Sequence, residues 1–165
     1  MRKFLLILAV AALTLASLAA SAGDFKTRQG SWVIGGGLGF TEDPQLFGLE
    51  ALVNYYITDE ISVGPLFQFE LSGRDQVLGL TGMVKYSALL KDSGVVRPYG
   101  QLGIGFAEFR VDDLFDGKRK TTYLFPVGGG MEFKLLEKLW LDGNILFNLS
   151  PEIFIGLFLG VGYIF

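Results

Sequence analysis

The side chains of this chain that could support chemistry are acids, lysines, arginines and hydroxyls, because the sequence contains no histidine and no cysteine. Histidine is the commonest general base, and a serine or aspartate nucleophile without it would need a lysine or a second carboxylate beside it. No segment is arranged for that. Carboxylates are also the only strong metal ligands present, and no loop has the spacing of a calcium site. The composition therefore argues against an enzyme and predicts neither a cofactor nor a metal.

Charged residues occur at alternate positions within several apolar segments, on the face whose other members are glycine or polar. Alternate residues of a strand point to opposite sides of a sheet, so these charges would share one side. Five of them fall in the half of the predicted strands nearer the chain termini: Lys85, Arg97, Glu132, Lys134 and Asp142. A charge in a low-dielectric interior is costly unless it is paired. We therefore predict that these three cations and two carboxylates form a mutually neutralising network.

Two further inward carboxylates, Glu50 and Glu70, lie on adjacent predicted strands in the other half, without an inward cation of their own. Water, a bound cation, or Arg74 folding back from its turn could satisfy them. The alternative to a specific ion site is a wet vestibule, a water-filled opening at one end of the interior that these strands would enclose, and both interpretations stay open at this point.

A glycine run at Gly35, Gly36 and Gly37, followed by Gly39, could suggest a phosphate-binding loop. That motif requires a helix directly after the strand, and no helical pattern follows here. Glycines that face a narrow interior explain the run better.

The alternation is clearest in the last segment, residues 152–165. One face of this segment is large and apolar, and half of the other face is glycine. Neither face is polar, which argues against a strand of a soluble sandwich. A helix is disfavoured because three glycines would each cost about 1 kcal/mol relative to alanine. The pattern predicts a membrane-spanning strand with its bulky face in lipid and its small face in a crowded lumen.

Seven earlier segments repeat this alternation and are separated by turn residues. Each has at least the roughly 9–11 residues that a tilted strand needs to cross a bilayer. The predicted strands are 30–40, 46–57, 61–72, 76–87, 97–110, 121–134, 138–149 and 152–165. In hydrocarbon the sheet edges must pair, so the last strand should be antiparallel to the first. The predicted fold class is all-β, an eight-stranded antiparallel up-and-down transmembrane β-barrel.

The first 22 residues have the organisation of a secretory signal peptide. Arg2 and Lys3 precede an apolar run, and Ala20-Ser21-Ala22 supplies a small-x-small cleavage site. A retained anchor is disfavoured because the run is rich in alanine and short for a bilayer, which needs roughly 20 strongly apolar residues. We predict that residues 1–22 are cleaved and that residues 23–165 form a single barrel domain. The formal net charge of −3 and the lack of a basic patch argue against nucleic acid.

The signal peptide, the eight alternating segments and the terminal Phe165 together resemble the small bacterial outer-membrane β-barrels of the OmpA/OmpX type, a porin-like family. The match covers essentially the whole mature chain and is carried by pattern, so it concerns fold and location more than activity. It implies a monomer in the bacterial outer membrane, in contact with its lipids. It also implies that periplasmic chaperones and the barrel-assembly machinery recognise the terminal strand through Tyr163 and Phe165.

The resemblance also bears on function. Enzymes among such barrels resemble one another in relying on a histidine base, and members with adhesive or invasive roles carry long outer loops, whereas the longest connection here is 112–120. The leading hypothesis is a non-enzymatic integral barrel with a role in envelope structure or surface contact, its lumen plugged by polar and charged side chains. One alternative is a narrow porin-like channel for small solutes or ions. Another, a soluble lipid-carrying barrel in the periplasm, is disfavoured by the doubly apolar strands and Phe165.

Overall fold

The computed structural model describes residues 28–42, 46–72, 75–88, 95–110, 119–151 and 153–165. The predicted signal peptide, the turn that contains Arg74 and most of the connection 112–120 lie outside these residues. In the described part of the chain, no helix is both long and apolar enough to cross a membrane.

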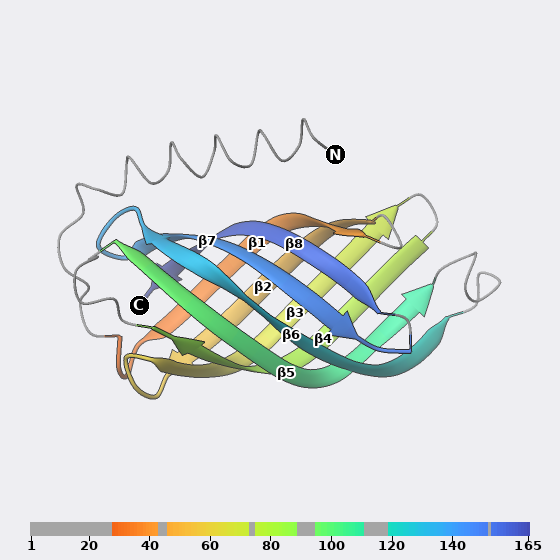
Figure 1. The fold of residues 1–165 in the computed structure, drawn as a ribbon, viewed down its shortest axis with the longest axis horizontal. Coiled ribbons are helices and arrows are strands. Elements are labelled where there is room, and N and C mark those ends of the chain that lie inside the picture. Colours follow the sequence, from red (N-terminus) through yellow and green to blue (C-terminus); the bar gives the residue numbers. More distant parts are fainter. Residues whose placement is uncertain (1–27, 43–45, 73–74, 89–94, 111–118, 152) are drawn as a thin grey trace.

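Eight strands follow one another along the chain and close into a barrel (Figure 1). Each strand is antiparallel to both of its neighbours, and sequence order is also the order around the barrel. The predicted fold class is confirmed, because each predicted strand overlaps an observed one. The strands are β1 (Trp32–Glu42), β2 (Leu46–Tyr56), β3 (Ile61–Ser72), β4 (Asp75–Ser87), β5 (Val96–Arg110), β6 (Lys120–Lys134), β7 (Leu139–Leu149) and β8 (Phe154–Ile164).

The barrel closes where β8 pairs with β1. The register runs from Val33 opposite Ile164 to Glu42 opposite Ile155. Beyond the last strand residue, the Phe165 amide donates to the Trp32 carbonyl at 2.9 Å. The predicted antiparallel pairing of the last strand with the first is therefore confirmed, and each strand has a hydrogen-bonded neighbour on both sides, as a hydrocarbon environment requires.

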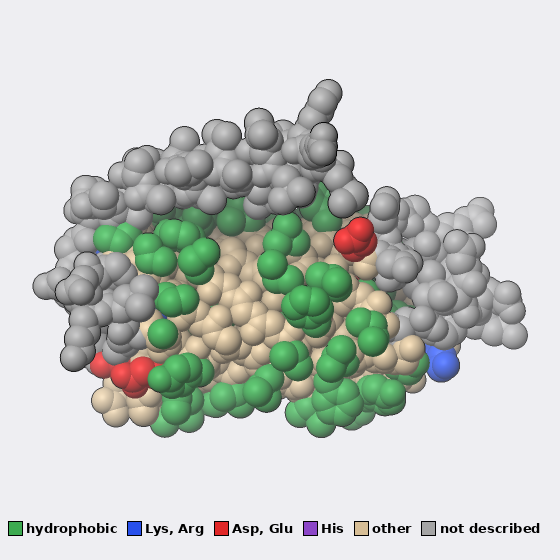
Figure 2. All heavy atoms as spheres, viewed as in Figure 1, with side chains coloured by type: hydrophobic (Ala, Val, Ile, Leu, Met, Phe, Trp, Pro, Cys, Tyr) green, Lys and Arg blue, Asp and Glu red, His purple; other side chains and the backbone are tan. Residues whose placement is uncertain are grey.

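Side chains alternate between the outer surface and the lumen, as the sequence pattern predicts. On β5, Ile104 and Phe106 are 64% and 70% exposed on the outer surface, whereas Ala107 is 1% exposed. Figure 2 shows apolar side chains spread over one outer face, with the acidic and basic ones only toward its two ends. Such an apolar band flanked by polar rims is the surface of a lipid-embedded barrel.

Aromatic side chains gather at both rims of this band. At the end where β1 begins and β8 ends, here the terminus end, the rings of Trp32 and Tyr55 are 5.0 Å apart between centroids. At the opposite, far end, Phe40 and Phe47 make an edge contact at 5.5 Å. Aromatic rings at these two levels are typical of side chains that sit at lipid headgroups.

Inward side chains lie in successive layers along the lumen. Toward the far end lies an apolar cluster made of Leu46, Val77, Ala107, Phe109, Leu124 and Phe154. A second cluster lies nearer the middle and consists of Leu66, Met83, Leu146 and Phe158, with Leu52 packed against it. The layers toward the terminus end are polar and charged.

Three inward glycines make room for the ring of Phe158. A β-carbon added to Gly39, Gly48 or Gly156 would come within 2.5 to 2.8 Å of a ring atom of this phenylalanine. These glycines belong to β1, β2 and β8, so one aromatic side chain fills a socket walled by three strands. The glycines of this lumen thus serve close packing.

Candidate functional site in the barrel lumen

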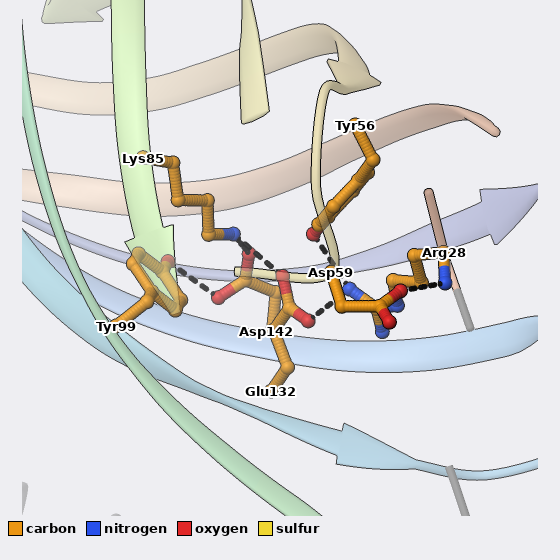
Figure 3. Close-up of polar contacts among 7 residues, drawn as sticks. All are labelled: Arg28, Tyr56, Asp59, Lys85, Tyr99, Glu132 and Asp142. Atoms are coloured by element: carbon orange, nitrogen blue, oxygen red, sulfur yellow. Dashed lines mark hydrogen bonds and ion pairs between the residues drawn. The ribbon is translucent and has the colours of Figure 1, made fainter. Parts of the chain in front are cut away.

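Lys85 of β4 extends into the lumen toward carboxylates on β6 and β7 (Figure 3). Its Nζ lies 2.6 Å from Glu132 Oε1 on β6 and 3.5 Å from Asp142 Oδ2 on β7. The Tyr99 hydroxyl of β5 donates to Asp142 Oδ1 at 2.7 Å, and Lys85 Nζ lies 3.5 Å from the centroid of the Tyr99 ring. All four side chains are buried. Each charge therefore has an oppositely charged or hydrogen-bonding partner, without which burial would be strongly unfavourable.

A second cation, Arg28, enters this network from a segment that precedes β1 (Figure 3). It is 1% exposed. Its Nη1 donates to Glu132 Oε2 at 2.5 Å and to the Tyr56 hydroxyl at 2.6 Å. Its Cζ lies 3.8 Å from the centroid of the Trp140 ring, a stacking distance that favours a cation. Burial disfavours the Arg28 cation, but the Glu132 carboxylate and Tyr56 outweigh it, so the pKa of Arg28 lies above its ordinary value.

A short turn holds Arg28 in this position. The backbone amides of Arg28 and Gln29 both donate to Oδ1 of Asp59, at 2.6 and 3.0 Å. Gly30 donates to the Tyr56 carbonyl at 2.9 Å and has a φ of 77°, in the left-handed region where glycine is unstrained. The turn between β2 and β3, which contains Asp59, thus anchors the segment that brings Arg28 to the lumen.

The other two predicted cations border the network. Arg97 is 1% exposed, and its Cζ lies 6.0 Å from the centroid of the Tyr56 ring. Lys134 is also buried and pairs in register with Trp140. The structure thus brings Lys85, Glu132 and Asp142 into direct contact and places Arg97 and Lys134 in the same end of the lumen.

Glu50 and Glu70 lie apart from this network. Glu50 Oε1 accepts a hydrogen bond from Asn144 Nδ2, on the other side of the lumen, at 2.9 Å. Glu70 is paired in register with Gly48 and is 0% exposed. Both side chains are buried among the other residues of the lumen. Arg74, the partner considered from the sequence, lies outside the described residues.

Several members of the site were not among the predicted site residues. Tyr56, Tyr99 and Trp140 supply a hydroxyl or a ring to the cations, and all three occupy inward positions of the alternating pattern, which places a side chain in the lumen without showing what it contacts. Asn144, the partner of Glu50, does so too. Arg28 gave no such signal, because it precedes the first alternating segment and no strand periodicity applies to it.

A small cavity adjoins the network on the side of β1 and β8. Its volume is about 20 Å³, and its lining includes Arg28, Asn54, Glu132, Trp140 and Gly162. A cavity of this size holds about one water molecule when its walls are polar.

Chemically, the site ties distant parts of the barrel together through charge. Within the described ranges, no group of three acidic or other metal-ligating side chains converges on one point. The hydroxyls of Tyr56 and Tyr99 are held by Arg28 and Asp142. The arrangement joins β4, β6, β7 and the segment before β1 by ion pairs.

Comparison with known proteins identifies the family. A model of the outer membrane protein beta-barrel domain matches residues 7–165. No curated protein matches the chain. The chain is similar to the N-terminal β-barrel domain of OprF from Pseudomonas aeruginosa, with 17% identity and a TM-score of 0.66 over 85% of this chain and 100% of that one.

Two further solved structures share the fold. Ail, the attachment invasion locus protein of Yersinia pestis, is 17% identical with a TM-score of 0.57, over 83% of this chain and 99% of that one. The outer membrane enzyme PagL is 12% identical with a TM-score of 0.50, over 79% of this chain and 98% of that one. Likeness at such identities shows the fold alone, and the fold occurs with and without catalysis.

The family model spans nearly the whole sequence, and the closed wall of eight strands presents an apolar band to its surroundings. The chain belongs to the outer membrane protein beta-barrel family and is a transmembrane protein of the bacterial outer membrane.

Proposed function

We propose that this protein is a non-enzymatic barrel that contributes to envelope structure or surface contact, with a lumen plugged by its own side chains. The observation that carries the proposal is the succession of filled layers along the lumen. An ion-paired layer around Lys85 and Glu132 occupies the terminus end, and the two apolar clusters follow toward the far end. An eight-stranded barrel has an interior just wide enough for side chains to fill.

Electrostatic arguments favour a lumen closed to ions over a lumen that conducts them. An ion moving through the lumen would first have to displace Lys85 or Glu132 from a buried pair and would then lose its water beside apolar side chains such as Leu124 and Phe158. Both steps are unfavourable, since unpaired charges are strongly disfavoured in a low-dielectric interior.

The chemistry of the site supports a non-catalytic role. The lumen carboxylates Glu132 and Asp142 are engaged by cations and a hydroxyl, and the sequence supplies no histidine to act as a base. Neither carboxylate is paired with an activated nucleophile in the way that covalent catalysis requires.

The proposed partners are outer-membrane lipids, periplasmic chaperones and the barrel-assembly machinery, and the outer surface and the last strand support this proposal. The outer band is suited to outer-membrane lipids, and a monomer suffices to close the sheet. Tyr163 and Phe165 are exposed side by side, with ring centroids 5.0 Å apart, and would be accessible to periplasmic chaperones and the barrel-assembly machinery.

Single-channel recording in planar lipid bilayers tests the plug. The purified wild-type protein should give no steady conductance. The double variant Lys85→Ala/Glu132→Ala removes both members of the central pair and should raise ion leakage while lowering stability. Steady conductance of the wild type would instead support a narrow channel for small solutes or ions.

A further inference from the structure

The three side chains that contact Arg28 form a binding site for a guanidinium group. Trp140 offers the face of its ring, Tyr56 a hydroxyl oxygen, and Glu132 a carboxylate oxygen. We call these three side chains the guanidinium cage. An aromatic face combined with a carboxylate is the chemistry that selects a flat, delocalised cation over a hydrated ammonium ion.

The cage and its occupant come from different parts of the chain. Trp140, Tyr56 and Glu132 belong to β7, β2 and β6, which are held in place by the hydrogen bonds of the closed wall. Arg28 belongs to the segment before β1, which is attached at this point through Asp59 and the Tyr56 carbonyl. If this segment moved away, the three residues of the guanidinium cage would therefore keep their positions.

The fit of Arg28 is incomplete. A single nitrogen, Nη1, makes both of its side-chain hydrogen bonds, whereas Nε and Nη2 are buried without a hydrogen-bond partner. The cavity of about 20 Å³ lies next to the same side chain. A guanidinium group without the backbone constraint could turn and present two nitrogens to Glu132, the bidentate geometry that binds carboxylates most strongly.

We propose that the terminus-end mouth of the barrel is a binding site for small guanidinium compounds, which the protein's own Arg28 fills as an exchangeable intramolecular ligand. An external guanidinium compound competes with Arg28 for the stacking surface of Trp140 and for Glu132 Oε2. A ligand tethered by a short segment has an effective concentration of about the millimolar range, so competition by free ligand is weak while Arg28 is present.

Fluorescence of Trp140 provides a direct readout of this exchange. The chain has two tryptophans, and Trp32 lies on the outer surface, so Trp32→Phe leaves Trp140 as the sole reporter. In this background, the refolded full-length protein is titrated with methylguanidinium chloride, and with methylammonium chloride at the same concentrations. Arg28→Ala should give a saturable change with methylguanidinium, at a midpoint at least about tenfold lower than that of the background protein, because the tethered competitor is gone.

Three controls define the site. Methylammonium should give no saturable change, since it lacks the planar fork of the guanidinium group. Glu132→Gln added to Arg28→Ala should abolish saturation, and Arg119→Ala, which removes an exposed arginine from the far end, should match the background protein. A linear response of Arg28→Ala, equal curves for both cations, or equal midpoints with and without Arg28 would overturn the proposal.

If Arg28→Ala does not fold, Asp59→Ala decides the matter. This variant keeps Arg28 and the whole cage but removes the acceptor of the two backbone amides that hold the segment. Its methylguanidinium midpoint should fall below that of the background protein. An unchanged midpoint in a folded Asp59→Ala protein would show that Arg28 does not exchange.

Discussion

Lys85 and Glu132 form an ion pair at 2.6 Å inside the lumen, although β4 and β6, which carry them, are separated in the wall by β5. The hydrogen bonds of the wall connect neighbouring strands only, whereas this ion pair connects two strands that are not hydrogen-bonded to each other. It resists deformation of the barrel cross-section in a way that the sheet alone does not.

Replacing Lys85 should therefore destabilise the barrel. Lys85→Met keeps most of the side-chain volume and leaves the buried carboxylates with one cation fewer. Breaking a buried pair by removing one partner costs about 3–5 kcal/mol. Reversible urea unfolding in phospholipid vesicles measures the loss of unfolding free energy.

The exposed pair between Arg119 and Glu108 provides the control. Its atoms are 3.3 Å apart, and the Arg119 side chain is 68% exposed. Surface pairs contribute about 0–1 kcal/mol, so Arg119→Ala should stay within that range. A Lys85→Met protein as stable as Arg119→Ala would mean that the lumen pair carries no net stability.

The wall and the facing of its residues could be predicted from the sequence, because a period of two is a local property of each segment. The partners of the lumen charges could not. Which cation meets Glu132 depends on the register of all the strands between them, and register accumulates around the barrel. Glu50 shows the same limit, since its partner Asn144 lies 94 residues away on β7. Arg28 was not predictable because the pattern begins only after it.

The socket around Phe158 should make Gly48 intolerant of even one methyl group. A β-carbon at Gly48 would lie 2.8 Å from ring atom Cε1, and the ring has no room to yield because Gly39 and Gly156 border it closely as well. Overpacking of this kind costs about 1–3 kcal/mol. The free energy of urea unfolding should fall by that amount in Gly48→Ala.

Gly82→Ala is the matched control for this change. It lies on the outer surface of β4, where the nearest atom to an added β-carbon is 3.9 Å away. Alanine is favoured over glycine within a strand by roughly 0.5–1 kcal/mol, so Gly82→Ala should be neutral or slightly stabilising. Equal losses in both variants would argue against a socket specific to Phe158.

A charged residue introduced into the outer apolar band should destabilise the barrel. Ile104, 64% exposed near the middle of β5, faces lipid in the outer membrane. Arginine at the bilayer midplane costs about 2–4 kcal/mol, so Ile104→Arg should destabilise by that amount in vesicles, with Ile104→Leu as the neutral control. Tolerance of both substitutions would place Ile104 outside the hydrocarbon layer.

Leu159→Arg and any substitution at the neighbouring Gly160 should both destabilise the barrel, for different reasons. A β-carbon at Gly160 would lie 2.5 Å from the Gly36 carbonyl oxygen and 2.8 Å from the Gly37 α-carbon. Any side chain there presses on the β1 backbone. Both positions should therefore be intolerant, one because of lipid and the other because of close strand contact.

The side chain and the backbone of Phe165 should have separate roles in assembly and in folding. Its amide donates a hydrogen bond to the Trp32 carbonyl, which extends the pairing of β8 with β1 by one residue. Its side chain is 64% exposed and contacts the ring of Tyr163. Removing Phe165 takes away one backbone hydrogen bond, worth about 0.5–1.5 kcal/mol, which is too little to prevent folding. The truncated protein should therefore still refold in detergent. Urea unfolding of the refolded protein, compared with the wild type, measures this.

Assembly in the cell should respond differently, because a recognition signal depends on the exposed aromatic side chain. We expect the truncated protein to accumulate in the periplasm, with a large fall in its outer-membrane fraction. Phe165→Tyr keeps the ring and should keep the yield, whereas Phe165→Ala keeps the backbone hydrogen bond but should resemble the truncation. A normal outer-membrane yield of Phe165→Ala would rule out Phe165 as the assembly signal, since that variant separates the ring from the hydrogen bond.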